Sequence, residues 1–261
     1  MSRTEYSEEG VTHCKGKEAI LESARQSFKM LGVDRIAVYL LHAPDTTTPF
    51  EEQMEAIQEL YLEGRFEQFG ISNFSAAQIK EIHAISTARN YVLPTVYQGS
   101  NSLLLRSVES SLLPTLRSLD ISFHGYAPLA GGFLSSTPSL ISHPLSGGRW
   151  DTGNWVGKLY QSKYNRPGFI EYLEEFIELT KESGIGQAEI AGRWVRWHRV
   201  LDGGRGDKII VGSRKAEQLE GTLVGMERGP LVEGVVQRLE KMWEKIEERS
   251  PGHEYVLAHF S

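Results

Sequence analysis

Two places in this sequence hold side chains that could do chemistry. His42 ends an apolar run within LLHAPD (residues 40–45), where an imidazole with a pKa of about 6.5 can donate a proton near neutral pH. Ser213, Arg214 and Lys215 follow another apolar run and precede a helical pattern. The free N–H groups and dipole of a helix start favour an anion there. A lone histidine is more often a packed core residue, and cations at a helix start are usually solvated, so both assignments depend on their surroundings.

The elements that would position these residues are short apolar runs rich in β-branched residues. There are five clear runs, at residues 35–41, 66–72, 94–98, 121–126 and 208–212. Longer segments of helical period separate them, which is the pattern of repeated βα units. Such strands are covered on both faces and therefore show little alternation. The sequence predicts an α/β fold with a parallel sheet.

Local start signals support this alternation. Thr48, Pro49 and Glu51 predict a capping box with proline at the first helical position. Ser75 and Gln78 predict a second capping box. Each of the two boxes follows one of the apolar runs, so each predicts a helix after a strand.

Other segments complete the pattern. Helical periods are expected at about 18–31, where one apolar stripe includes Leu31, and at 168–183, 186–198, 215–226 and 231–249. The polar stretch before the first helix makes a poor buried strand. The segment 131–167, rich in Gly, Ser and Pro, is too long for an ordinary connection, and loops of that size usually border a site.

Composition excludes several classes of function. The 261 residues, 40% apolar and 24% charged, are predicted to form a single domain over 1–261. The net charge of −6 is spread along the chain without a basic stripe, which excludes nucleic acid as a partner. Cys14 is the single cysteine, which fits a reducing compartment. No signal peptide or run of about 18 apolar residues is present, so we expect a cytoplasmic protein that does not bind a membrane.

Five motifs resemble one known family. They are LLHAPD (40–45), GISNF (70–74), PTVYQG (94–99), YAPLAGG (126–132) and VGSRKAEQL (211–219), in the order found in the aldo-keto reductases. The resemblance is to the branch containing the aflatoxin aldehyde reductases and covers about residues 10–256. It implies a (β/α)8 TIM-type barrel, here incomplete, with about six βα units plus a C-terminal helix.

The resemblance implies NADP as the cofactor, bound without a Rossmann fingerprint, which this sequence also lacks. Two cations, Arg214 and Lys215, precede the last two predicted helices. They suit a 2′-phosphate and therefore favour NADP over NAD. By position, the implied cofactor-binding residues are Ser72, Asn73, Gln98, Tyr126, Pro128, Leu129, Ala130, Gly131, Ser213, Arg214, Lys215 and Gln218. Tyr126 would stack on the nicotinamide ring, and Thr222 replaces an asparagine of the family's adenine contact.

The sequence departs from the family at the residues of proton transfer. Carbonyl reduction needs an acid, which in the family is a tyrosine supported by a lysine and an aspartate. The chain begins at about the third strand of the family, so the aspartate and tyrosine have no counterpart, and the lysine would fall near Arg3 or Thr4. His42 is the recognisable catalytic residue. Ala127 also replaces the asparagine of the family's NPLAGG.

Two readings of function follow. The first is an NADP-dependent oxidoreductase that converts a small-molecule carbonyl to an alcohol, impaired here because the catalytic aspartate, tyrosine and lysine are missing. The alternative is a non-redox isomerase or cyclase of specialised, secondary metabolism, or a cofactor-binding or scaffold protein. Arg149 resembles a substrate-side arginine of the family, although a surface role fits nearly as well. An incomplete barrel exposes strand edges, which favours either a chain that is an N-terminally truncated part of a longer protein or a homo-oligomer formed through those edges.

Overall fold

The computed structural model describes the backbone of residues 6–7 and 10–11 and all atoms of residues 16–252. Cys14, Arg3 and Thr4 lie outside the described residues. The chain divides into two compact units. Unit 1 takes in the described residues of Met1–Gly99 and Ser110–His124, and unit 2 takes in Ser100–Glu109 and the described residues of Gly125–His253. The single domain expected from the sequence stays a prediction.

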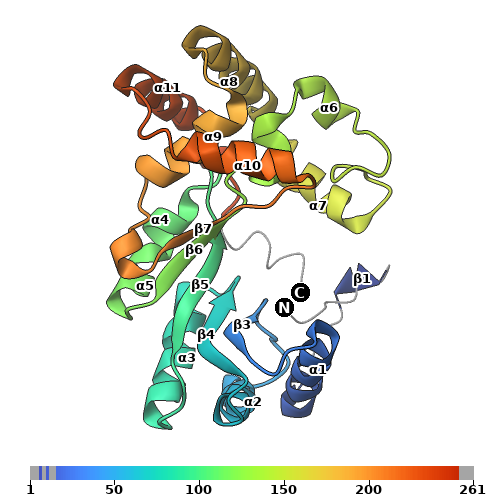
Figure 1. The fold of residues 1–261 in the computed structure, drawn as a ribbon, viewed down its shortest axis with the longest axis vertical. Helices are drawn as coiled ribbons and strands as arrows, with labels where there is room; N and C mark the ends of the chain where they lie inside the picture. Colours follow the sequence, from blue (N-terminus) through green and yellow to red (C-terminus); the bar gives the residue numbers. More distant parts are fainter. Residues whose placement is uncertain (1–5, 8–9, 12–15, 253–261) are drawn as a thin grey trace. The chain divides into compact units, whose positions relative to one another are not determined.

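Five strands form one sheet in chain order, as Figure 1 shows. They are β3 (Ile36–Leu41), β4 (Phe66–Ser72), β5 (Pro94–Ser100), β6 (Ser122–Tyr126) and β7 (Lys208–Ile210). The β3–β4 and β4–β5 pairs are parallel. The five predicted strands and the α/β fold class, an incomplete TIM-type barrel, are therefore confirmed. Two short strands, β1 (Tyr6–Ser7) and β2 (Gly10–Val11), pair with each other in a separate antiparallel sheet.

The helices of unit 1 follow its strands. They are α1 (Gly16–Leu31), α2 (Phe50–Leu62), α3 (Ala76–Ala88) and α5 (Leu113–Ser118), with α4 (Ser107–Ser111) at the boundary between the units. The stripe of α1 buries Ala24 and Phe28, but Leu31 is 58% exposed, so the buried stripe ends earlier than predicted. The Schellman-type stop after α2 falls at Gly64, whose φ of 74° suits glycine.

One of the two predicted capping boxes is confirmed. Ser75 Oγ accepts a hydrogen bond from Gln78 N, and the Gln78 side chain accepts one from Ser75 N. The box at Thr48 is wrong, because the N-cap of α2 is Pro49 and no side chain caps it. The Thr48 hydroxyl donates instead to Asp45 Oδ2 at 2.5 Å. Burial raises the pKa of Asp45, but hydrogen bonds from Thr48 and Thr47 outweigh it and lower that pKa.

Unit 2 is mostly helical. Its longer helices are α7 (Trp155–Tyr164), α8 (Phe169–Ser183), α9 (Gln187–Trp197), α10 (Ala216–Met226) and α11 (Glu233–Glu244). Its short elements are α6 (Pro138–Ser142) and the 3-10 turns η1 (Ala130–Ser135), η2 (Gly203–Arg205) and η3 (Glu247–Arg249). The helices expected after the fourth strand are thus confirmed, with the last one shorter than predicted.

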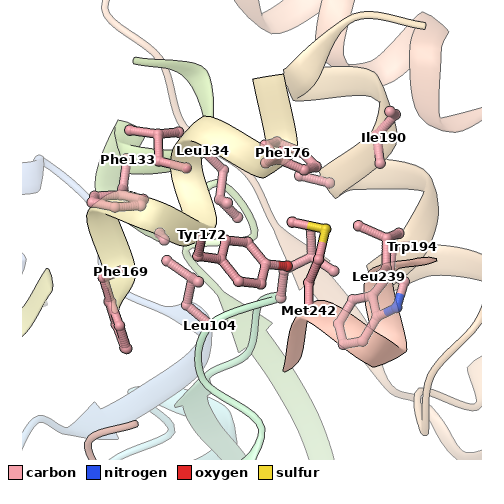
Figure 2. Packing of buried hydrophobic residues seen from close by; sticks show 14 of the residues in the cluster. Leu104, Phe133, Leu134, Phe169, Tyr172, Phe176, Ile190, Trp194, Leu239 and Met242 are labelled. Carbon is pink, nitrogen blue, oxygen red and sulfur yellow. The ribbon is translucent and has the colours of Figure 1, made fainter. Parts of the chain in front are cut away.

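The core of unit 2 lies between α8, α9, α11 and η1. Figure 2 shows Phe133 and Leu134 of η1 facing Phe169, Tyr172 and Phe176 of α8. Phe169, Tyr172 and Phe176 follow one another at intervals of three and four residues, so their side chains lie on one face of α8, and that face is buried. Burying apolar surface supplies roughly 25 cal/mol per Å², so this packing holds η1 and the segment after β6 in place.

Candidate functional site

A cleft of about 790 Å³ lies within unit 2. Its volume falls in the range of roughly 300–1,000 Å³ typical of small-molecule sites. Three parts of the chain line it: the segment after β6, the long segment before α8, and the residues that lead into α10. The lining includes Tyr126, Ala127, Pro128, Leu129, Gly131, Gly132, Arg149, Trp150, Tyr160, Gly212, Ser213, Arg214, Gln218 and Thr222. The long segment therefore borders a cleft, as its length predicted.

The first wall is the turn after β6, residues 126–132, called the glycine turn below. Ala127, Ala130 and Gly131 have φ values of 56°, 50° and 66°. Ala130 N donates to Ala127 O at 2.8 Å, and Gly132 N donates to Leu129 O at 2.9 Å. A positive φ is uncommon for alanine and costs about 1–2 kcal/mol, so the asparagine that Ala127 replaces is the better tolerated residue. Such strain is concentrated at functional sites.

Aromatic side chains form the second wall. The Tyr160 ring lies 5.6 Å from that of Trp150 and 5.9 Å from that of Tyr164. Trp150 Nε1 donates to Gly131 O at 3.3 Å, which ties the long segment to the glycine turn. The Arg149 guanidinium lies 5.8 Å from the Tyr160 ring centroid. Trp150 and Tyr160 line the cleft, although no sequence motif predicted them.

Two buried tyrosines, Tyr126 of the glycine turn and Tyr164 beside the aromatic wall, are poor acids. Burial raises the pKa of Tyr126 to about 12, and the neighbouring Tyr160 adds to the shift. Burial likewise raises the pKa of Tyr164 well above 10. Tyr126 therefore stays neutral at physiological pH, which suits a stacking contact better than proton donation.

The third wall leads into α10. Lys215 is its N-cap residue, and Ser213 Oγ donates to Lys215 O at 2.7 Å. Ser213 and Arg214 line the cleft beside Gln218, whereas Lys215 does not line it. The N-terminus of a helix of this length favours an anion. Arg214 is exposed, and within the described residues it forms no ion pair.

Four further candidate residues lie together in unit 1, at the carboxyl ends of β3, β4 and β5. Asn73 Nδ2 donates to His42 O at 2.8 Å and to Ser72 Oγ at 3.2 Å. Ser72 pairs with Gln98 in the β4–β5 register. Ser72 and Asn73 are buried, whereas the His42 side chain is exposed. The carboxyl ends of barrel strands are where such folds carry their active sites.

The candidate residues thus form two groups. His42, Ser72, Asn73 and Gln98 come together in unit 1, and Tyr126, Pro128, Leu129, Gly131, Ser213, Arg214 and Gln218 come together around the cleft of unit 2. Ala130 is fully buried and contributes the backbone of the glycine turn. Among the described residues no group of three His, Cys, Asp or Glu side chains could hold a metal ion. In the same residues no helix combines the length and apolarity needed to cross a membrane.

Lys163 of α7 is a buried cation beside the aromatic wall of the cleft. Its side chain is 7% exposed, and its amine lies 5.5 Å from the Tyr164 ring centroid. Burial, together with the smaller effect of the Arg166 charge, lowers the pKa of Lys163 to about 8. The folded chain therefore holds the lysine proton less well than the unfolded chain does.

Replacing Lys163 with methionine is expected to raise the free energy of unfolding at pH 7 by about 2–3 kcal/mol, since each unit of pKa is worth about 1.4 kcal/mol. The wild-type protein gains stability as the pH rises from about 8 towards 10.5, because over that range the folded state has released the lysine proton while the unfolded state still holds it. The advantage of Lys163→Met should consequently shrink at pH 10. Urea unfolding at both pH values measures it, and an advantage that is equal at pH 7 and pH 10 would contradict the assignment.

Parallel strands with polar groups at their carboxyl ends are typical of the class of β/α-barrel proteins. The model of the aldo/keto reductase family matches residues 6–244, and the chain belongs to that family.

Known relatives agree with this membership. The chain is 41% identical over 240 residues to the oxidoreductase sirO of Leptosphaeria maculans, covering 92% of this chain and 72% of that protein. It is 37% identical over 228 residues to an aldo-keto reductase of Pseudocercospora fijiensis, covering 87% and 77%. It is 32% identical over 244 residues to aflatoxin B1 aldehyde reductase member 2 of Rattus norvegicus, covering 90% and 66%. These relatives confirm the resemblance to the aflatoxin aldehyde reductase branch.

Proposed function

We propose that the cleft of unit 2 binds NADP(H) and that the protein is an NADP-dependent oxidoreductase acting on a small-molecule carbonyl. One observation carries the proposal: the glycine turn and the residues leading into α10 line the same cleft within one unit. They bring a ring-stacking tyrosine and a guanidinium into one site. A dinucleotide needs both kinds of contact.

The residues fit the cofactor on several counts. The glycine turn offers a backbone surface on which phosphates can lie, because Gly131 and Gly132 have no side chains. Arg214 offers the planar donor group that recognises a phosphate, with Ser213 beside it. Tyr126 presents a neutral ring at the end of β6, where the family places its nicotinamide contact. Ser72, Asn73 and Gln98 lie in unit 1, and the proposal that they contact the carboxamide rests on the family resemblance alone.

Reduced nicotinamide, when bound, supplies a hydride to the carbonyl carbon of a substrate. The carbonyl oxygen must then receive a proton from this chain. His42 is the residue proposed for that role, because its imidazole is exposed at the end of β3. Asn73 holds the backbone of His42 through its carbonyl and so fixes where the imidazole can reach.

Reductase activity of this chain is proposed to be impaired. The raised pKa of Tyr126 removes it as a substitute acid, which leaves the work to His42. The same observation favours a second candidate function, a cofactor-binding protein or a non-redox isomerase or cyclase of specialised metabolism, in which His42 performs acid–base work. A cytoplasmic location and a homo-oligomer formed through the sheet edges at β3 and β7 remain part of the proposal.

Fluorescence titration of the 261-residue chain is expected to show binding of NADPH at least about tenfold tighter than of NADH, as a single lost charge-assisted contact implies. Arg214→Met should abolish this preference. Arg205→Met is the matched control, because Arg205 is an exposed arginine of unit 2 outside the cleft. Equal affinity of the wild type for both cofactors would refute the NADP assignment.

NADPH oxidation with a panel of aldehydes is expected to stay below about 1 s⁻¹, the low end of typical enzyme turnover. His42→Asn should lower whatever turnover remains, since the amide cannot donate a proton as an acid. Turnover above about 1 s⁻¹ would contradict the proposed impairment while leaving the cofactor assignment intact.

A further inference from the structure

The connection between α10 and α11, residues 227–232, is held by side chains of α9. Arg193 Nε donates to Gly229 O at 2.8 Å, and Arg193 Nη2 donates to Pro230 O at 2.7 Å. His198, the C-cap residue of α9, accepts a hydrogen bond at Nε2 from Leu231 N at 2.7 Å. Three successive residues of the connection are therefore bound by two side chains that the cofactor assignment does not use.

This attachment determines where α10 lies. The buried residues of α10 are Gly225 and Met226 in its last turn, and Met226 O accepts a hydrogen bond from Trp197 Nε1 at 2.8 Å. Its first turn is mostly exposed, and it comes shortly after Ser213 and Arg214, which line the cleft. A helix of 11 residues is a rod of about 16 Å, so a shift of its last turn moves its start as well.

The contact made by His198 depends on the protonation of its ring. An imidazole nitrogen accepts a hydrogen bond only while it carries no proton, and an imidazolium has two donors and no acceptor. The charged groups that act on the ring are Arg193 on its own helix and Glu233 and Glu240 on α11. Burial, followed by the Arg193 charge, lowers the pKa of His198, and the two carboxylates offset this only in part. The ring is consequently neutral at physiological pH and can bind Leu231 N.

We propose that Arg193 and His198 are positioning residues of the cofactor site, which fix the connection after α10 and thereby hold Ser213 and Arg214 at the cleft. Protonation of His198 places a donor against the N–H of Leu231 and a second cation beside Arg193. Both changes push the connection away from α9, and the start of α10 moves with it. Cofactor affinity therefore falls as the pH drops below about 6.5, where histidine gains its proton. This role rests on the proposed function, because Arg214 is the proposed phosphate-binding residue.

Binding of NADP to the 261-residue chain tests the role of His198 without any turnover. Dissociation constants are measured by protein fluorescence at about pH 8 and about pH 5 for the wild type and His198→Gln. The glutamine oxygen can accept from Leu231 N but does not titrate. The ratio of the wild-type to the His198→Gln dissociation constant is expected to rise by on the order of tenfold from the higher to the lower pH.

The ratio isolates His198 from other titrating groups. The 2′-phosphate of NADP itself gains a proton at about pH 6, but this effect cancels because both proteins bind the same ligand. His83→Gln is the matched control, since His83 lies on α3 in unit 1. The ratio of the wild-type to the His83→Gln dissociation constant should be the same at both pH values.

Arg193→Met should weaken NADP binding at about pH 8 by on the order of tenfold, because two carbonyl groups of the connection lose their donor. Arg228→Met is its control. Arg228 belongs to the same connection, but its ion pair with Glu189 leaves its side chain 61% exposed, and the expected change is below about twofold. In the Arg214→Met background, Arg193→Met should lose most of its effect, because the group that it positions is gone.

Other results overturn the inference in distinguishable ways. A wild-type to His198→Gln ratio that is equal at both pH values shows that the ring does not act on the cleft, although binding itself leaves the proposed function intact. An undiminished effect of Arg193→Met in the Arg214→Met background shows that Arg193 does not act through the start of α10. Circular dichroism is expected to show folded protein at both pH values, and unfolding of the wild type at the lower one would assign its weaker binding to unfolding. If the wild type binds no NADP at the higher pH, the proposed function fails and this role fails with it.

Discussion

Replacing Arg106 with alanine is expected to lower the free energy of unfolding by about 3 kcal/mol, because a buried guanidinium is lost together with its packing and with its half-exposed carboxylate partner. Arg106 follows β5 and is 4% exposed. Its guanidinium lies 4.2 Å from the Trp194 ring centroid and 4.7 Å from that of Trp243. Nη1 lies 2.6 Å from Glu240 Oε2. The side chain therefore joins the segment after β5 to α9 and α11 by charge and by packing.

The physical reason for the large effect is that several contacts are lost together. Burial lowers the pKa of Arg106, and the carboxylate of Glu240 and the two indole faces offset that desolvation. Alanine removes the cation, leaves Glu240 without its closest partner and leaves a void between two indoles. Urea unfolding followed by circular dichroism measures the loss.

Tyr172→Phe is the matched comparison for Arg106→Ala. Figure 2 shows the Tyr172 ring among the core residues, and its hydroxyl is buried without a hydrogen-bond partner among the described residues. Removing an unsatisfied hydroxyl is expected to leave stability unchanged or to raise it by about 1 kcal/mol. A loss below about 1 kcal/mol for Arg106→Ala, close to the effect of Tyr172→Phe, would show that the packing of Arg106 against Trp194 and Trp243 does not stabilise the fold.

Sequence patterns were sufficient where a structure depends on neighbours in the chain. The capping box of Ser75 and Gln78 involves two residues of one turn, and it is confirmed. The box at Thr48 is wrong because contacts from outside the turn compete for it: the Thr48 hydroxyl turns to Asp45, and Gln53 donates to the carbonyl oxygens of Asp45 and Thr48. A start signal in the sequence does not reveal such competing acceptors.

The same distinction, between features set by chain neighbours and features set by more distant contacts, applies to the candidate site. Ser72 and Gln98 could be placed beside each other because parallel strands align their ends, and the β4–β5 register pairs them. Trp150 and Tyr160 could not be found, because they lie in an irregular segment whose course is fixed by packing on Gly131 rather than by a periodic pattern. The one available signal was the length of that segment, which indicates a site without identifying the residues that face it.

Gly131→Ala is expected to lower the free energy of unfolding by about 3 kcal/mol and to weaken NADPH binding by at least about tenfold. The φ of Gly131 is 66°, which costs an alanine about 1–2 kcal/mol. The new Cβ would also stand 1.8 Å from Tyr160 Cε1 and 2.5 Å from Cδ1. Tyr160 cannot simply move away, because Trp150 and Tyr164 pack against it. The glycine turn or the aromatic wall must therefore shift, and both line the cleft.

Gly147→Ala separates the two causes of this effect. Gly147 has a similar φ of 72°, but nothing lies within 4 Å of the Cβ that alanine would add. Its expected loss is therefore the backbone term alone, about 1–2 kcal/mol, with binding unchanged. In the double variant Gly131→Ala with Tyr160→Ala, the contact is gone, so the cost of the alanine should fall to that of Gly147→Ala. If Gly131→Ala costs no more than Gly147→Ala in the wild-type background, Tyr160 does not hold the glycine turn, and the aromatic wall has no part in shaping the cleft.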